Sequence, residues 1–205
     1  MYAVEMGRET SGRAPVFVLV HGLGMSNRYM MPTAELLTPW GKVHAPDLPG
    51  FGRSDKPARV LTIPELADSL AEWMAATELQ APILIGNSLR AQVIVDVAVR
   101  YPSRFTGAML VGMTIDPVPR RLSTQIGRLL LDIPREPPGL YWRAATDYCR
   151  AGFRRCLQTL RHALADPIAD KLPRVRVPVL LVRGERDSLV PQRWTERAAA
   201  LIFPK

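Results

Sequence analysis

Ser88 stands where a short apolar run gives way to a helical pattern. Residues Ile83 to Gly86 have the composition of a buried strand, and the chain from Leu89 onward has that of a helix packed against it. A sharp strand-to-helix turn at a serine exposes its hydroxyl at the carboxyl edge of a sheet, and small flanking residues leave room for the turn. Backbone N–H groups at the helix start could then stabilise developing negative charge. The arrangement suits nucleophilic attack by Ser88; the alternative is that this serine merely caps the helix.

Four segments in a fixed order accompany this turn. They are residues 21–24 (HGLG), 47–54 (DLPGFGRS), 86–89 (GNSL) and 184–187 (GERD). By these segments the chain resembles the α/β-hydrolase superfamily, from about residue 15 to its end. They look like the HGxG oxyanion loop, the D-x-x-G-x-G-x-S loop, the nucleophile elbow and the loop of the catalytic acid.

The resemblance implies a role for individual residues. Ser88 would be the nucleophile and Asp187 the acid that orients a histidine, with Asp116 as a reserve acid after another strand. The backbone N–H groups of Leu23 and Leu89 would bind the oxyanion. Relatives that open epoxides or remove halides attack with aspartate, whereas a serine suits acyl transfer on a small ester, lactone, thioester, amide or activated ketone. No metal and no other cofactor is expected.

Position 90 departs from the family pattern, because Arg90 stands where the elbow normally has a small residue. Either this side chain tilts outward and the turn adjusts, or the turn is displaced and the hydroxyl is misdirected. The residues alone do not decide between these two outcomes.

The histidines are the second departure. In the family the catalytic histidine follows the acid after one more strand, which places it beyond Lys205. His21 is expected to hold the oxyanion loop by hydrogen bonds, His44 to lie in a short strand, and His162 to lie in the lid. We therefore expect a truncated family member that lacks its last core strand and its base, and that is weakly active or inactive by itself.

Alternation of apolar runs and helical patterns predicts an α/β fold, with a mostly parallel sheet and helices on both faces. Strands are expected at 16–20, 42–45, 83–86, 109–112 and 179–183, with an edge strand at 2–6. Helices are expected at 28–37 and at 89–100. Two more are expected to begin at the capping box of Thr62 and Glu65 and at Pro191.

Residues 117–176 interrupt the alternation and are interpreted as a helical lid, inserted into a core made of residues 1–116 and 177–205. Helical pieces are expected at 124–131, 140–164 and 167–172. From Arg120 to Arg176 the chain has twelve basic and five acidic residues, so this segment carries most of the net charge of +8. Aromatic residues do not alternate with the arginines, which favours a solvated basic face over a nucleic-acid surface; attraction of anionic substrates or surfaces is the alternative.

The two cysteines, Cys149 and Cys156, are seven residues apart and are expected on one helix face as small buried thiols. They cannot form a four-ligand zinc site by themselves. Neither a membrane-spanning apolar stretch nor a secretory signal is found in the sequence, so a cytoplasmic location is expected.

Two functional hypotheses remain open from the sequence. The first is a serine hydrolase with a small-molecule substrate, no nucleic-acid or membrane partner, and possible self-association through an open sheet edge. The alternative is a non-catalytic binding protein of the same fold, which Arg90 and the absent histidine favour.

Overall fold

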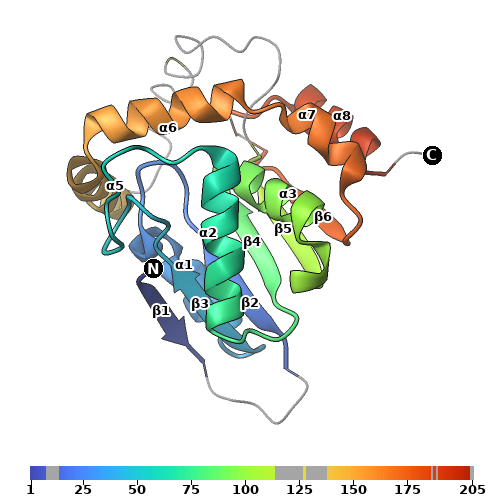
Figure 1. The fold of residues 1–205 in the computed structure, drawn as a ribbon, viewed down its shortest axis with the longest axis horizontal. Coiled ribbons are helices and arrows are strands. Elements are labelled where there is room, and N and C mark those ends of the chain that lie inside the picture. Colours follow the sequence, from blue (N-terminus) through green and yellow to red (C-terminus); the bar gives the residue numbers. More distant parts are fainter. Residues whose placement is uncertain (8–13, 114–126, 128–137, 186, 188, 204–205) are drawn as a thin grey trace.

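A mixed six-stranded sheet forms the centre of the computed structural model, which describes residues 1–7, 14–113, 127, 138–185, 187 and 189–203. The strand order is β1-β3-β2-β4-β5-β6, and only β1 runs antiparallel to its neighbour (Figure 1). The strands are β1 (Ala3–Met6), β2 (Val16–Val20), β3 (Lys42–Pro46), β4 (Ile83–Asn87), β5 (Gly107–Val111) and β6 (Val179–Val182). This confirms the predicted fold class.

Helices cover both faces of this sheet. They are α1 (Asn27–Leu37), α2 (Ile63–Ala76), α3 (Arg90–Arg100) and α8 (Gln192–Ile202), with a short η1 (Pro102–Arg104) after α3. Val18 and Leu84 pack in the larger apolar cluster with α2 and α3, while Phe17 and Leu19 pack in a second cluster with α1. Because successive strand residues point to opposite faces, the solid apolar runs of β2 and β4 serve both layers.

The starts and ends of elements follow local chemistry. The predicted capping box at the start of α2 is present, with Thr62 and Glu65 each bonded to the other's backbone. The strand expected at 109–112 lies at 107–111 instead, because Gly107 and Ala108 pair with β4 despite their small side chains. Gly112 then leaves the strand with a φ of +55°.

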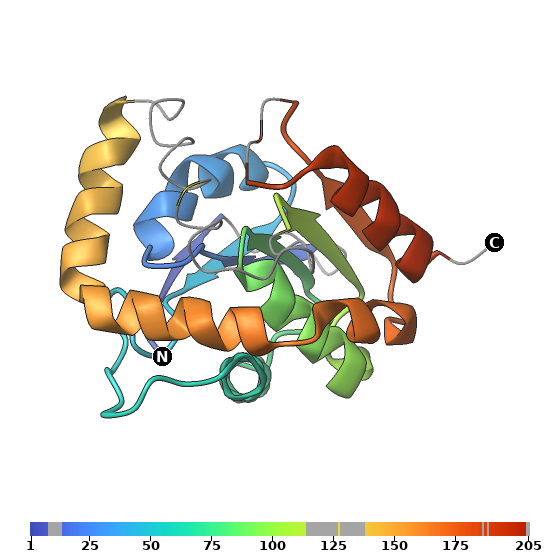
Figure 2. The ribbon, with the colours of Figure 1, turned by 90° about the horizontal axis from the view of Figure 1, so that it is seen from above.

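Two helices cross the edge of the sheet where the parallel strands end. These cover helices are α5 (Pro138–Ala151) and α6 (Phe153–Ala165), followed by the short α7 (Ile168–Lys171) and η3 (Leu172–Arg174). Figure 1 shows α6 above the sheet, and Figure 2 shows α5 and α6 meeting in an L. The division into core and lid remains a prediction, and the helix expected at 124–131 lies outside the described residues apart from Gly127.

The single helix expected at 140–164 is wrong, and with it one prediction about the cysteines. Gly152 has a φ of +84° and separates α5 from α6. Cys149 and Cys156 therefore lie on different helices, where Cys149 is exposed and only Cys156 is buried. Helical spacing applies only within one helix, so the shared-face prediction fails at this break.

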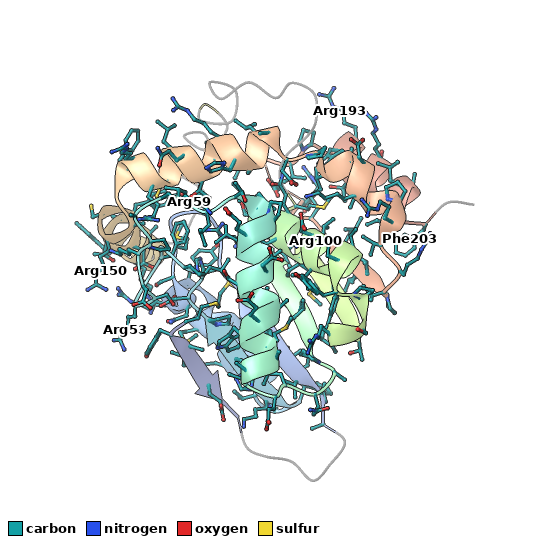
Figure 3. The ribbon with its side chains drawn as sticks, in the orientation of Figure 1. Arg53, Arg59, Arg100, Arg150, Arg193 and Phe203 are labelled. Atoms are coloured by element: carbon teal, nitrogen blue, oxygen red, sulfur yellow. The ribbon has the colours of Figure 1, made fainter. Side chains whose placement is uncertain are left out.

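Half of the twelve basic residues between Arg120 and Arg176 are seen to be exposed, Arg155 and Lys171 are partly buried, and four lie outside the described residues, so the solvated basic face stays a prediction. The exposed ones are Arg143, Arg150, Arg154, Arg161, Arg174 and Arg176. Figure 3 shows Arg150 projecting away from the end of α5.

Strand β6 is the outermost strand on its side of the described sheet, and its residues Leu180 and Val182 are exposed. In the ranges given above, no helix combines the length and apolarity that crossing a bilayer requires.

Candidate active site

Ser88 occupies a strained turn between β4 and α3. Its φ of +56° lies in the left-handed region, which is unusual for a residue with a side chain. The turn is fixed by a 2.8 Å hydrogen bond from the backbone N–H of Ser88 to the carbonyl of Val111 in β5. A Cβ atom at Gly86 would lie 2.5 Å from Cδ1 of Ile94, so this position has no room for a side chain. The turn therefore has the geometry that exposes a nucleophile.

The HGLG loop lies directly beside this turn. A Cβ atom at Gly22 would be 3.7 Å from the Cβ atom of Ser88. The backbone N–H groups of Leu23 and Leu89 have no hydrogen-bond partner within the described ranges. Two unused donors at these positions are what an oxyanion site requires.

His21 holds the HGLG loop in place through both of its ring nitrogens. Its Nδ1 lies 2.9 Å from the carbonyl of Gly22, and its Nε2 accepts a 3.2 Å hydrogen bond from the backbone N–H of Leu48. Complete burial, with a smaller contribution from the charge of Arg90, lowers the pKa of His21 to about 3. Both ring nitrogens are used, so His21 has the structural role expected of it and cannot take the proton of Ser88.

Asp187 lies at the same edge of the sheet as Ser88. Its Oδ1 accepts hydrogen bonds from the backbone N–H groups of Leu189 and Val190, at 2.8 and 2.9 Å. Its Oδ2 faces Gly112, where a Cβ atom would be 3.3 Å away. The end of β5 thus contacts both candidate residues. Val111 accepts the hydrogen bond from the turn at Ser88, and Gly112 lies next to the carboxylate of Asp187. Oδ1 of Asp187 binds its own loop, and Oδ2 has no hydrogen-bond partner among the residues that the structure describes.

The remaining predicted groups are placed as follows. His44 is buried in β3, with Nδ1 3.7 Å from a carboxylate oxygen of Glu5, and His162 lies half-buried in α6. None of the chain's three histidines, all within the described ranges, hydrogen-bonds Ser88. Asp116 lies outside the described residues, and the position of the catalytic histidine stays a prediction.

The segment 47–54 is a self-bonded structural loop. The buried carboxylate of Asp47 accepts from the backbone N–H groups of Asn27 and Arg53, at 2.6 and 2.9 Å. The hydroxyl of Ser54 donates to the carbonyl of Asp47 and accepts from the N–H of Tyr2. This motif therefore fixes the start of α1 and the start of β1.

The outward orientation considered for Arg90 is wrong. Its side chain is completely buried, with its guanidinium carbon 4.4 Å from the ring centre of Phe51. The turn at Ser88 nevertheless keeps its left-handed conformation. Stacking on the ring of Phe51 accommodates the Arg90 side chain beneath the cover helices. Residue type alone did not indicate this stacking.

Sequence reasoning missed two residues of α5 that contact the loop of the candidate site. Asp147 accepts hydrogen bonds from Ser26, and the ring of Tyr148 lies where a Cβ atom of Gly24 would be, 2.5 Å from Cε1. Nothing in their local sequence signals these contacts, because their partners are more than a hundred residues away.

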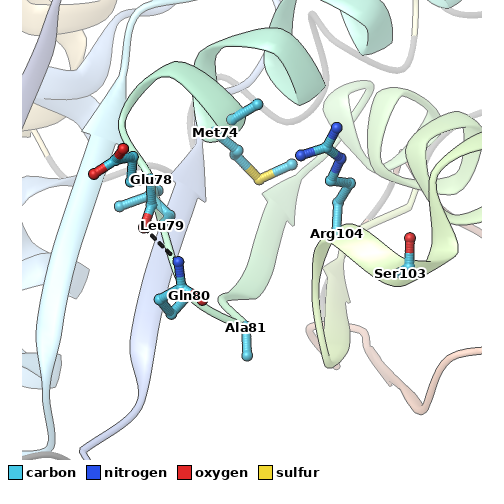
Figure 4. A pocket seen from close by; sticks show the side chains of 8 residues that line it. Met74, Glu78, Leu79, Gln80, Ala81, Ser103 and Arg104 are labelled. Carbon is cyan, nitrogen blue, oxygen red and sulfur yellow. Dashed lines mark hydrogen bonds between the residues drawn. The ribbon is translucent and has the colours of Figure 1, made fainter.

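A surface hollow of about 680 Å³ lies at the opposite end of the sheet, between the end of α2 and η1 (Figure 4). Glu78, Gln80 and Arg104 are among its lining residues, and none of the predicted site residues contributes to it. The described residues also contain no group of three or more His, Cys, Asp or Glu side chains suited to a metal ion.

Comparison with known proteins agrees with this geometry. The sequence model of the alpha/beta hydrolase family matches residues 17–204. The chain therefore belongs to the alpha/beta hydrolase family, as the motifs predicted.

Individual relatives define the likeness more closely. A pimeloyl-[acyl-carrier protein] methyl ester esterase of Xanthomonas oryzae pv. oryzae is 28% identical over 220 residues, covering 93% of this chain and 83% of that protein. A protein of the same name from Shewanella sp. strain MR-7 is 33% identical over 106 residues, covering 50% of this chain and 36% of its own length. For three of the curated relatives, the chain spans only 22% to 39% of their length.

The fold has close counterparts among solved structures. A thermophilic esterase from Thermogutta terrifontis superposes with a TM-score of 0.80 at 21% identity, covering 98% of this chain and 80% of that one. At this identity the likeness concerns the fold alone.

Proposed function

We propose that this protein hydrolyses carboxylic esters with Ser88 as its nucleophile. The observation that supports this most directly is the left-handed turn at Ser88, with the HGLG loop packed against it and Asp187 at the same sheet edge. Backbone strain of this kind is concentrated at functional sites.

The proposed chemistry is a two-step acyl transfer. The hydroxyl oxygen of Ser88 attacks the ester carbonyl, and the N–H groups of Leu23 and Leu89 hold the resulting oxyanion. Loss of the alcohol leaves an acyl-enzyme, which water then hydrolyses. The proton of Ser88 passes to a general base oriented by Asp187, and His21 is not that base because both of its ring nitrogens are already engaged.

The cover helices α5 and α6 act as the lid in this proposal. They cross the carboxyl ends of the strands, where ligands bind in α/β folds. A small ester is the proposed substrate. The name shared by the Xanthomonas and Shewanella relatives, pimeloyl-[acyl-carrier protein] methyl ester esterase, supports ester hydrolysis.

The experiment is hydrolysis of p-nitrophenyl acetate by the protein as its gene encodes it. Ser88→Ala should lower kcat by about a thousandfold or more, since removing a serine nucleophile abolishes the acyl-enzyme route. Ser103→Ala, an exposed serine near the opposite end of the sheet, is the matched control and should leave kcat unchanged. Equal rates for the two variants would contradict the proposal.

The alternative is a non-catalytic binding protein. Arg90 at the elbow and the absence of a histidine bonded to Ser88 favour it. Turnover that is undetectable in the gene-encoded protein, together with a serine that no fluorophosphonate labels, would establish this alternative.

A further inference from the structure

Arg90 carries a buried positive charge without a hydrogen-bond partner. The residue is 0% exposed, and Nε, Nη1 and Nη2 all lack a partner within the described ranges. A guanidinium has five N–H donors, and enclosing them without acceptors is strongly unfavourable. A fully enclosed arginine normally has a carboxylate beside it.

Within the described part of the chain, the titratable groups that interact with Arg90 are neutral at physiological pH. They come from three elements: His21 in the loop after β2, Tyr148 in α5 and Cys156 in α6. Burial lowers the pKa of His21 to about 3 and raises the pKa of Tyr148 to about 12, and it also raises the pKa of Cys156. Phe51 supplies an aromatic face at 4.4 Å, which attracts the cation but accepts none of its hydrogen bonds.

Two further buried polar side chains, on α3 and α6, lack partners within the described ranges. Gln92, in the first turn of α3, is 0% exposed, and neither its amide nitrogen nor its amide oxygen makes a hydrogen bond within the described ranges. The hydroxyl of Thr159 on α6 is equally buried and equally without a partner. Within the described residues, the first turn of α3 and the cover helix α6 thus bury polar side chains that have no hydrogen-bond partner.

We propose that Arg90 binds a carboxylate of the substrate, so that the preferred ester carries an anionic group a few bonds from the carbonyl attacked by Ser88. The inference rests on the proposed function and specifies its substrate class. A carboxylate matches the planar fork of a guanidinium and brings one negative charge to one positive charge.

Occupation of this site requires the cover helices to move. Arg90 is closed off in part by Tyr148 and Cys156, which belong to α5 and α6. The carboxylate would therefore enter when these helices separate from α3, and closure over the bound anion would complete the pairing.

The test is equilibrium binding of two probes that differ in one charge. Monomethyl glutarate has one carboxylate and one ester, and dimethyl glutarate is its neutral counterpart. Titration calorimetry is carried out on the gene-encoded protein in the Ser88→Ala background, which prevents turnover. Arg90→Met removes the charge with little change in length, and Arg104→Met removes an exposed charge near the opposite end of the sheet.

The proposal expects monomethyl glutarate to bind at least about tenfold more tightly than dimethyl glutarate, since a charge-assisted bidentate pair is worth that much. Arg90→Met should abolish this preference, Arg90→Lys should restore part of it, and Arg104→Met should keep it. Equal affinity for the two probes, absence of binding by both, or a preference that survives Arg90→Met would overturn the proposal.

These outcomes are separate from those of the proposed function. A carboxylate preference that depends on Arg90 can be measured whether or not Ser88 is a nucleophile. Conversely, hydrolysis that depends on Ser88 but shows no preference for the anionic probe would remove the role of Arg90 alone.

Discussion

Asp147 accepts two hydrogen bonds from Ser26, from its backbone N–H at 3.0 Å and from its hydroxyl at 2.6 Å, although 121 residues separate the two. Ser26 is the residue that precedes α1, and its own side chain does not cap that helix. The buried carboxylate of α5 takes this place, and negative charge is favourable at a helix N-terminus. The cover helix is thereby bonded to the chain immediately after the HGLG loop.

Asp147→Ala should lower the free energy of unfolding by about 2 to 3 kcal/mol, because it leaves both donors of Ser26 without their charged acceptor. Chemical denaturation measures the change. Asp170→Ala, an exposed carboxylate on α7, is the control and should cost no more than about 0.5 kcal/mol. Similar losses in the two variants would show that the bond to Ser26 does not stabilise the fold.

Gly24→Ala should destabilise the protein by about 2 kcal/mol and lower ester turnover. Gly24 has a φ of +71°, and an added Cβ would lie 2.5 Å from the ring of Tyr148. Gly139→Ala is the matched control, since Gly139 lies in α5 with nothing within 4 Å of an added Cβ. There the same change should stabilise by about 0.5 to 1 kcal/mol. A loss at both positions, or at neither, would contradict this assignment of the loop.

His21 should make the protein sensitive to mild acid. The pKa of His21 is about 3 in the folded chain and 6.5 in the unfolded chain. Below 6.5 only the unfolded chain gains the proton, so stability is full above this pH and falls continuously as the pH drops towards 3. From about pH 7 to about pH 5 the loss from this group should be about 2 kcal/mol.

The measurement is urea denaturation at a series of pH values for the wild type and for His21→Gln. The variant can still accept from Leu48 but does not titrate, so its stability should fall less steeply over this range. An unchanged slope would mean that another group causes the acid sensitivity.

Lys171→Met should cost about 3 kcal/mol or more. Lys171 is paired with Asp96 of α3 and with Asp166, whose side chains are only 3% and 4% exposed. Removing the cation leaves the buried carboxylates of Asp96 and Asp166 without the charge between them, although Arg100 still pairs with Asp96. Lys56→Met, at an exposed lysine, should cost about 1 kcal/mol at most. Thermal or chemical denaturation distinguishes the two, and comparable effects would refute the role of this ion-pair cluster.

Most of the sheet could be predicted from the sequence because its strands are solid apolar runs followed by distinctive loops. Val16–Val20 and the turn at Ser88 lie where they were expected. The strand at Gly107–Val111 begins earlier than predicted, because small residues give no periodic signal and only pairing with β4 reveals them.

The contacts that cover the site could not be predicted in the same way. A single glycine, Gly152, divides the expected long helix through its φ of +84°. The spacing of apolar residues on either side of it does not reveal this break. The bond between Asp147 and Ser26 and the burial of Arg90 depend on where α5 and α6 cross the sheet. That crossing is a property of tertiary packing, which local sequence does not encode.

The central claim, that Ser88 is an activated nucleophile, is tested most directly by locating a covalent adduct. The gene-encoded protein is treated with a fluorophosphonate, digested, and mapped by mass spectrometry, with Ser88→Ala and Ser103→Ala alongside. The account predicts one adduct, on Ser88, that is lost in Ser88→Ala and kept in Ser103→Ala. Labelling that persists in Ser88→Ala, or an unlabelled Ser88 in the wild type, would contradict it.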